Sequence, residues 1–449
     1  MKKVALHNLG CKVNAYETEA MQEMLENHGY EIVPFKEGAD IYIINTCTVT
    51  NMADRKSRQM LHRAKKMNPE AIVVACGCYV QAMKDQVDES IDIVVGNNRK
   101  KDIVEILAEY EENIGDQKKP IAKNDEQTEK SIQTELIDIN HTKEYEELSL
   151  SQTVEHTRAY IKVQDGCNQF CSYCIIPYAR GRVRSREEKD IFAEVTQLVE
   201  AGYQEIVLTG IHLSSYGIDR GKPELLQLLE KLHDIEKLRR IRLGSLEPRI
   251  ITEEFAGRIS RMPKICPHFH LSLQSGCDSV LQRMNRRYDS GEYFEKTQLL
   301  RKYYEDPAIT TDVIVGFPGE TWEEFEQTRK FVEKVQFFEM HIFKYSCRHG
   351  TRAAQMDGQL TEAQKAERSS ILLELERTMS RSYRERFLGS EVEVLLEEKK
   401  EIDGRNYWIG HTPQYVRIAL EAADNIDRHN TLIRGRAADF LQEDILLIR

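Results

Sequence analysis

The chain has 449 residues, of which 41% are hydrophobic and 31% charged, and its formal net charge is −11. This length predicts two to four domains, and the acidic balance excludes a protein that coats nucleic acid by bulk charge, although a local basic patch stays open. No uninterrupted apolar run of about 18 residues and no signal sequence is found, so we expect a cytoplasmic protein with no membrane partner.

Residues 1–112 alternate short apolar runs with amphipathic stretches. Strands are expected at KKVALHNL, DIYIINT, AIVVAC and IDIVVG, and helices over residues 14–28 and 51–66. Strands that alternate with helices predict a Rossmann-like parallel sheet in an α/β domain. The second helix has a basic face, which is more often solvated than functional. That face carries Arg55, Lys56, Arg58, Arg63, Lys65 and Lys66.

The rest of the chain divides into three segments. Residues 113–152 are polar and weakly patterned, which predicts a linker. Residues 153–385 carry six further strands, at AYIKVQ, EIVLTG, RRIRLGS, FHLSLQ, TTDVIVGF and MHIFKYS, with helices between them. Six such units fit a partial TIM-type α/β barrel, whose function lies at the C-terminal ends of its strands. Residues 386–449 switch to short strands and predict a small all-β barrel.

Three of the ten cysteines, Cys167, Cys171 and Cys174, form a CxxxCxxC pattern after the first strand of the barrel. In a long cytoplasmic chain, clustered cysteines indicate metal binding or catalysis rather than disulfides. Soft thiolates suit iron, and three ligands to a four-iron cubane leave one iron open. A structural zinc with a histidine as fourth ligand, or cysteines without metal, are the alternatives.

This motif, with the aromatic Tyr173 before its last cysteine, resembles that of the radical S-adenosylmethionine (SAM) superfamily. The resemblance implies that the open iron binds the methionine moiety of SAM and that reduction of the sulfonium releases a 5′-deoxyadenosyl radical. Further candidates for holding the cofactor lie at other strand ends of the barrel. They are Gly210, Ser245, Glu247 and Gln274, and for each alone ordinary turn chemistry is an equally good explanation.

Three more cysteines each follow a predicted strand of the first domain: Cys11, Cys47 and Cys78. The C-terminal ends of parallel strands share one edge of a sheet, so we expect these cysteines to converge into a second three-ligand site with an open iron. Cys76 competes with Cys78 but lies within an apolar run, where a buried free cysteine is common. The remaining three have no partner at ligand spacing: Cys266, Cys277 and Cys347.

The chain resembles the radical SAM methylthiotransferase family almost from end to end. The matching segments are LGCKVNAYETE, NTCTVT, GCYVQ, VVGNN, TRAYIKVQDGCNQFCSYCIIPYARGRVRSR, LSLQSGCDSVLQRMNRRY and TTDVIVGFPGETWEEF, and the terminal barrel resembles an RNA-binding TRAM domain. The resemblance implies two [4Fe-4S] clusters. The first domain's cluster carries the sulfur that one SAM methylates, and SAM on the CxxxCxxC cluster makes the radical that removes hydrogen from the target carbon. An electron donor protein is implied as well.

Within this family, LGCKVN and VQDGCNQFCSYCIIPYARG resemble the branch that modifies C2 of N6-threonylcarbamoyladenosine, on the 3′ side of the anticodon in tRNA. Branches acting on N6-isopentenyladenosine in tRNA or on a ribosomal-protein aspartate are alternatives. An alternative from another class is a non-catalytic iron–sulfur or zinc protein that binds RNA. The sequence leaves the sulfur source and the oligomeric state open.

Two groups of residues are candidates for RNA contact. Arg180, Arg182, Arg184 and Arg186 occupy alternate positions, which on an extended chain is one face. That face suits RNA phosphates or a cofactor carboxylate, and an internally paired edge strand is the equal alternative. In the terminal barrel the candidates are Tyr407, Trp408, Tyr415, Arg405 and Arg417. Its acidic balance makes a structural module the safer interpretation on composition alone.

Overall fold

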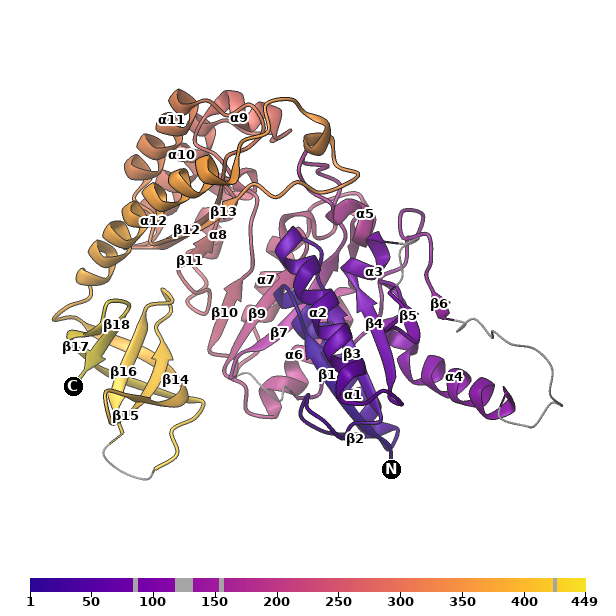
Figure 1. The fold of residues 1–449 in the computed structure, drawn as a ribbon. Coiled ribbons are helices and arrows are strands. Elements are labelled where there is room, and N and C mark those ends of the chain that lie inside the picture. The colour runs from indigo at the N-terminus through magenta and orange to yellow at the C-terminus, as the bar shows by residue number, and fades with distance from the viewer. Residues whose placement is uncertain (84–87, 118–131, 153–156, 423–425) are drawn as a thin grey trace.

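The computed structural model describes residues 1–83, 88–117, 132–152, 157–422 and 426–449. It has three parts, an N-terminal α/β domain, a central α/β barrel and a closed C-terminal β-barrel (Figure 1). The expected fold class is confirmed. Among the described helices, none is long and apolar enough to cross a membrane.

The N-terminal domain is built on a six-stranded parallel sheet with strand order β2-β1-β3-β4-β5-β6. Its strands are β1 (Lys3–Asn8), β2 (Glu31–Ile32), β3 (Ile41–Thr46), β4 (Ile72–Gly77), β5 (Ile93–Val95) and β6 (Gln133–Glu135). Its helices are α1 (Lys12–Asn27), α2 (Asn51–Met67), α3 (Cys78–Ala82), the 3₁₀ turn η1 (Lys100–Asp102) and α4 (Ile103–Gln117). Strand β3 is buried along its whole length, as expected for a parallel strand covered on both faces.

Part of the segment expected to be a linker belongs to this domain. Strand β6 pairs in parallel with β5 at the sheet edge. Leu148 and Leu150 are buried against α1, and the buried Glu146 accepts hydrogen bonds from the backbone N–H groups of Asn98 and Lys101 at 3.2 and 3.1 Å. The polar composition concealed this because few apolar side chains suffice to dock an edge segment. Residues 118–131 lie outside the described part of the chain, and the domain boundaries stay a prediction.

The central barrel contains the six predicted parallel strands and one short antiparallel strand. They are β7 (Ala159–Asp165), β8 (Arg184–Ser185), β9 (Glu205–Gly210), β10 (Arg240–Leu243), β11 (His268–His270), β12 (Ala308–Val315) and β13 (Glu339–Lys344). The helices are α5 (Ile176–Arg180), α6 (Glu188–Glu200), α7 (Leu225–His233), α8 (Glu253–Ile259), α9 (Asp278–Arg283), α10 (Ser290–Tyr303) and α11 (Trp322–Val335), with 3₁₀ turns η2 (Leu213–Ser215), η3 (Ile218–Arg220), η4 (Pro248–Ile250) and η5 (Arg352–Gln355).

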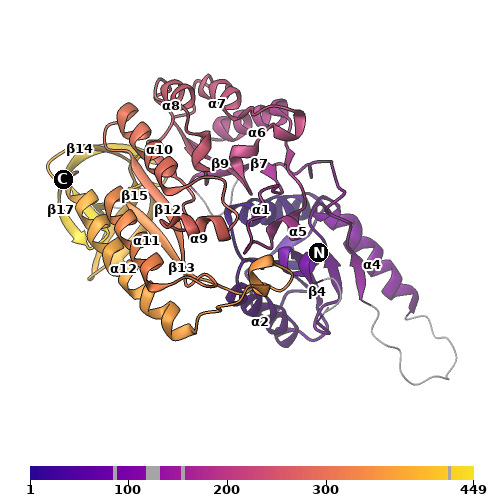
Figure 2. The ribbon, with the colours of Figure 1, turned by 90° about the horizontal axis from the view of Figure 1, so that it is seen from above.

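The two faces of the barrel strands differ in polarity. Alternate residues such as Ile161, Leu208 and Phe269 join one apolar core beneath the helices. Because successive side chains on a strand point to opposite faces, their polar neighbours, among them Lys162 and His268, line the inside. Figure 2 shows α6, α7 and α8 along one side of the barrel, α11 and the later helix α12 (Glu362–Glu385) along another, and the N-terminal domain against the remaining side.

Helix α12 (Glu362–Glu385) leads from the barrel to the C-terminal domain. It begins at a capping box in which Thr361 and Gln364 satisfy each other's backbone N–H groups. Five strands then close a barrel in the order β14-β15-β16-β18-β17. They are β14 (Glu391–Ile402), β15 (Arg405–His411), β16 (Arg417–Glu421), β17 (Thr431–Gln442) and β18 (Ile445–Ile448).

Candidate active site

The three cysteines of the N-terminal domain lie at the C-terminal ends of adjacent strands. Cys11 precedes α1 after β1, Cys47 follows β3, and Cys78 begins α3 directly after β4. Burial raises the pKa of Cys47 to about 11, and the nearby Cys78 and Cys11 add to that rise. The expected convergence of these cysteines, the N-terminal trio, is therefore present in the fold, because parallel neighbours bring their carboxyl ends to one edge.

Two glycines allow this convergence. Gly10 has a φ of +108°, and a Cβ built on it would lie 2.9 Å from the Cβ of Cys47. Gly77, just before Cys78, has a φ of +95°, and its Cβ would lie 2.5 Å from Oδ1 of Asn45. A larger residue at either position would force the loops that carry the cysteines apart.

Cys76 lies apart from this trio. Its side chain is fully buried in the apolar core, and its Sγ lies 3.6 Å from the carbonyl oxygen of Ile44. Cys266 and Cys277 are also buried, and Cys347 is exposed. The geometry therefore favours Cys78 as the third member.

A buried arginine from the barrel reaches into the N-terminal trio. Nε of Arg180, at the end of α5, donates to Sγ of Cys78 at 3.1 Å. Its Nη1 and Nη2 donate to the two carboxylate oxygens of Glu17 on α1 at 2.8 and 3.0 Å, and Nη1 also reaches Asp165. Although burial opposes the charged form, Cys78, Glu17 and Asp165 hold the pKa of Arg180 well above its usual value. Arg180 thus joins the trio to the barrel by charge-assisted hydrogen bonds.

The ionic network around Arg180 carries an excess of positive charge. Its buried members are Glu17, Glu146 and Asp165 on one side and Lys100, Lys162, Arg180 and Arg184 on the other. Lys162 bonds Glu17 and Asp165 at 2.6 and 2.7 Å, and Lys100 bonds Glu17 at 2.9 Å. Buried charge needs a partner, and thiolates on an iron–sulfur cluster would supply the missing negative charge beside Cys78.

A second contact holds the loop after Cys47 to the barrel. Arg348, which follows β13, donates to Thr48 at 2.7 Å, to Asp54 at 2.6 Å and to Asn51 at 2.6 Å. Arg348 is buried. The edge of the N-terminal sheet is therefore fastened on both sides to the central barrel.

The CxxxCxxC cysteines, the barrel trio, lie in one loop after β7. The N–H of Cys167 donates to Gly181 O, and that of Cys174 to Cys171 O, each at 3.0 Å. Nη1 of the half-buried Arg286 donates to Sγ of Cys171 at 3.2 Å. Burial raises the pKa of the Cys167 thiol to about 11. Each trio thus has one arginine directed at one sulfur.

The spacing of the sulfurs bears on which metal group fits. Tetrahedral zinc with Zn–S bonds of about 2.3 Å holds its sulfurs about 3.8 Å apart. Among the described residues, neither trio brings all three sulfurs within 4.8 Å of one another. The described trios therefore lack the close packing of a single zinc site, whereas a multi-iron cluster spreads its thiolate ligands over several metal ions.

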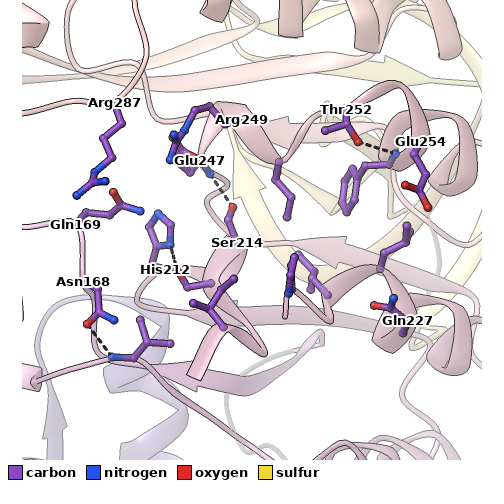
Figure 3. Close-up of a pocket in the computed structure, with 18 residues that line it drawn as sticks. Asn168, Gln169, His212, Ser214, Gln227, Glu247, Arg249, Thr252, Glu254 and Arg287 are labelled. Atoms are coloured by element: carbon purple, nitrogen blue, oxygen red, sulfur yellow. Dashed lines mark hydrogen bonds and ion pairs between the residues drawn. The ribbon is translucent and has the colours of Figure 1, made fainter. Parts of the chain in front are cut away.

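A cavity of about 710 Å³ opens beside the barrel trio, at the ends of β7, β9 and β10 (Figure 3). Its polar residues include Gln169, His212, Glu247, Arg249 and Arg287, and its apolar side is formed by Ile218, Leu225, Leu226, Ile250 and Phe255. Ser214 Oγ accepts a hydrogen bond from the backbone N–H of Glu247 at 2.9 Å. Arg249 Nε donates to the carboxylate of Glu247 at 2.9 Å. A volume and lining of this kind suit a small organic ligand.

Of the five residues expected to contact SAM, Glu247 lines this cavity. Tyr173 packs in an apolar cluster, Gly210 lies against Gln164, and Ser245 is exposed. Gln274 is buried at a left-handed φ of +73° after β11. His212, Arg249 and Arg287 were missed, although the position of IHLSS directly after β9 could have indicated His212. Burial, Arg286 and Arg249 lower the pKa of His212 to about 4.

Comparisons with known proteins give the family. Residues 3–96 match the family described as uncharacterized protein family UPF0004, and residues 161–332 match the radical SAM superfamily. Threonylcarbamoyladenosine tRNA methylthiotransferase MtaB of Bacillus subtilis (strain 168) is 39% identical over 430 residues, covering 95% of this chain and 92% of that protein. The chain belongs to the radical SAM tRNA methylthiotransferase family.

Other comparisons set the breadth of this similarity. The MtaB protein of Aquifex aeolicus (strain VF5) is 40% identical over 407 residues, with coverage of 90% and 95%. The tRNA-2-methylthio-N(6)-dimethylallyladenosine synthase of Moorella thermoacetica is 35% identical over 409 residues, with coverage of 88% and 87%. A structure of the radical SAM methyltransferase TsrM from Kitasatospora setae, with cobalamin and a [4Fe-4S] cluster, shares the fold at a TM-score of 0.55 and 16% identity, with coverage of 77% and 75%.

The family confirms that this methylthiotransferase is an enzyme with an iron–sulfur cluster and SAM as cofactors. Of the two interpretations of the arginine run after its cysteine motif, internal pairing holds for three of the four arginines. Arg180, Arg184 and Arg186 are buried, and Arg186 pairs with Glu194. They are internally paired because the run crosses the domain interface instead of an exposed edge. Arg182 is exposed, with its guanidinium 4.5 Å from the ring centre of Phe170.

The RNA candidates of the terminal barrel also change. Tyr407 and Trp408 are buried in its cores, so they cannot stack on bases. Tyr415 stacks on His268 at 5.0 Å between ring centres and joins this domain to the central barrel. Arg405 is exposed and Arg417 pairs with Asp444. Of this set, the two arginines remain candidates.

Proposed function

We propose that the enzyme installs a methylthio group at C2 of N6-threonylcarbamoyladenosine, on the 3′ side of the anticodon in tRNA. The use of both cysteine trios in one reaction is supported by the bond from Arg180 to Cys78, because it ties the N-terminal trio to the segment that follows the barrel trio. Relatives 39% and 40% identical over most of their length are named for this nucleoside. The dimethylallyl nucleoside of the Moorella relative is the second candidate.

Two [4Fe-4S] clusters are part of this proposal. Cys11, Cys47 and Cys78 would hold one, and Cys167, Cys171 and Cys174 the other. The clusters and SAM supply the sulfur, the methyl group and the radical when bound. The chain itself contributes the buried Arg180 and the half-buried Arg286, which would neutralise thiolate charge at one sulfur of each trio. An electron donor protein is a further expected partner.

The cavity beside the barrel trio is the proposed SAM site. Arg249 and Arg287 suit a carboxylate, the carboxylate of Glu247 suits an ammonium group, and the apolar side suits an adenine ring. His212 stays neutral at pH 7, because its pKa is lowered to about 4 and the imidazole does not take up a second proton. Its Nδ1 lies 2.7 Å from Ser215 Oγ. His212 therefore adds no positive charge next to the sulfonium.

Two exposed features are proposed to hold the tRNA. Arg55, Lys56, Arg58, Arg63 and Lys66 are exposed on α2, which begins three residues after Thr48. Near the barrel trio, Phe170 and the exposed Tyr178 pack edge to face at 5.8 Å, with Arg182 over Phe170. Cations bind phosphates, and aromatic rings stack on unpaired bases, which are what an anticodon loop offers.

Mass spectrometry of tRNA nucleosides from cells lacking the protein tests the substrate. We expect loss of the 2-methylthio form of threonylcarbamoyladenosine and its return with the wild-type protein, whereas a Cys174→Ala protein should not restore it. Loss of the 2-methylthio isopentenyl form instead would favour the second candidate. Unchanged tRNA would point to a ribosomal-protein aspartate or to a non-catalytic protein.

Salt titration tests the surface on α2. Replacing both Arg55 and Lys56 by alanine should weaken tRNA binding and reduce the slope of log K against log salt by roughly 1 for each cation. The control is the double variant Glu105→Ala and Glu109→Ala on α4, which also removes two exposed charged side chains from one helix. An unchanged slope in the α2 variant would remove this surface from the proposal.

A further inference from the structure

Two histidines and an aspartate meet on the inner face of the barrel. His270 ends β11, Asp312 lies on β12 and His341 on β13, and Asp312 and His341 are directly paired in register. One ligand atom from each of the three lies within 4.8 Å of the others. Their strand neighbours Phe269 and Val313 pack in the outer core, so the three side chains point inward. None belongs to the cysteine sites or to the SAM cavity.

The hydrogen bonds around this trio leave atoms free for a ligand. Nδ1 of His270 bonds Oγ1 of the buried Thr310 at 3.0 Å, which fixes the ring. Its Nε2 is buried and 3.3 Å from Oδ2 of Asp312, yet it makes no hydrogen bond among the described residues. Nε2 of His270 and Oδ2 of Asp312 are therefore both available to a ligand that lies between them. The ring of His341 stacks on that of His270 with centres 5.9 Å apart.

We propose that His270, Asp312 and His341 form a mononuclear site for a divalent transition-metal ion. Two imidazoles and one carboxylate are the ligand set that such ions take when coordination positions stay open. A metal-bound histidine normally anchors its second ring nitrogen, as His270 does on Thr310. The alternative is an ion pair between a protonated His270 and Asp312 at 3.3 Å, a contact that here lacks a well-aligned N–H···O hydrogen bond.

The ion would add positive charge to the inner face of the barrel. A divalent ion with one carboxylate ligand keeps a net charge of +1, and its open positions face the barrel interior. They suit the carboxylate of a threonylcarbamoyl group, whereas a dimethylallyl group offers no ligand atom. This role, but not the metal site itself, rests on the proposed function.

Zinc added to the cluster-loaded enzyme tests the site. The exposed Cys347, the reachable cysteine outside the two trios, is changed to serine first. After desalting we expect one zinc per chain, with X-ray absorption showing nitrogen and oxygen neighbours at about 2.0–2.2 Å and none at the Zn–S distance of about 2.3 Å. Failure to retain zinc, or sulfur neighbours, would overturn the site, and neither result bears on the tRNA substrate.

Variants assign the zinc to this trio. His341→Ala and Asp312→Asn should each lower retained zinc at least about tenfold. Loss of a residue that only supports a metal ligand already lowers metal affinity by about this factor, and loss of a ligand should cost at least as much. Iron content and melting temperature should hold, since both side chains are partly solvent-accessible. His268→Gln, on the same face two residues before His270, should keep its zinc. Equal retention in all three variants, or loss in His268→Gln, would overturn the assignment.

The mutual effect of zinc and nucleoside on each other's binding tests the carboxylate role separately from the metal site. If the ion binds the substrate carboxylate, N6-threonylcarbamoyladenosine must strengthen zinc retention by the same factor by which zinc strengthens nucleoside binding, and N6-isopentenyladenosine must not. An equal effect of both nucleosides, or of neither, would overturn the carboxylate role.

Discussion

The two cysteine trios use the same ligands but are assembled in different ways. The barrel trio comes from eight consecutive residues of one loop, whereas the N-terminal trio comes from three strand ends spread over Cys11 to Cys78. One arginine bonds a sulfur in each, Arg286 to Cys171 at 3.2 Å and Arg180 to Cys78 at 3.1 Å.

The surroundings of these arginines differ more than the trios do. Arg286 stays within the barrel, where it donates to the phenol oxygen of Tyr288 at 2.9 Å. Arg180 crosses the domain interface and meets Glu17 on α1. The N-terminal site is thus completed by a residue of another domain, the barrel, whereas the barrel site is completed by a residue of the barrel itself. The integrity of the N-terminal site should therefore depend on the domain interface.

The sharpest test exchanges one cysteine in each trio. Cys174→Ala should abolish both 5′-deoxyadenosine formation and methylthiolated product, because the radical starts there. Cys47→Ala should keep 5′-deoxyadenosine formation and lose product to background. Both are measured by mass spectrometry after anaerobic reconstitution, with iron per chain as a control for loading. Product from Cys47→Ala would end the two-cluster proposal.

Removing one arginine at a time tests the dependence on the interface. Arg180→Met should lower the free energy of unfolding by about 3–5 kcal/mol, because it leaves buried carboxylates short of a partner. It should also lower the iron content toward that of one cluster. Arg286→Met should instead reduce 5′-deoxyadenosine formation and keep the N-terminal iron.

The exposed Arg182→Met is the matched control, since a surface change of this kind stays within about 0.5 kcal/mol. Urea unfolding and iron analysis give both readouts. Equal iron in the Arg180 and Arg182 variants would mean that the N-terminal site does not need the barrel.

Mild acid should affect the two sites unequally. Burial favours the neutral form of the Glu17 carboxyl, but Arg180, Lys100 and Lys162 together hold its pKa well below its usual value. The Glu17 carboxylate therefore keeps its charge at pH 5. Burial lowers the pKa of His212 to about 4, so a protein that unfolds gains a proton there below about pH 6.5. The contribution of His212 to the free energy of unfolding is therefore complete above that pH and is lost progressively as the pH drops toward 4.

Urea midpoints measured from pH 7.5 to 5 check this sign. The wild type should lose about 1–2 kcal/mol more than His212→Gln over this range, because glutamine does not titrate. Parallel curves for the two proteins would show that His212 is not the group responsible.

Local patterns in the sequence were sufficient for the elements and for the cysteines. Apolar periodicity located the strands and helices, and strand ends located Cys11, Cys47 and Cys78, because parallel topology alone brings such ends together. The same reasoning could not decide whether Arg180, Arg184 and Arg186 form an exposed face or an internally paired one. An alternating charge pattern says which side chains share a face but not what that face meets.

What the sequence by itself determined is the family chemistry, since CxxxCxxC and the three strand-end cysteines are set by local spacing and strand order. Tertiary structure alone decided which charges are buried and which residues meet. Arg180 and Glu17 lie 163 positions apart, and His270, Asp312 and His341 come from three separate strands. Such contacts must offset the free-energy cost of removing charges from water, and that cost depends on the packed surroundings and not on neighbours along the chain.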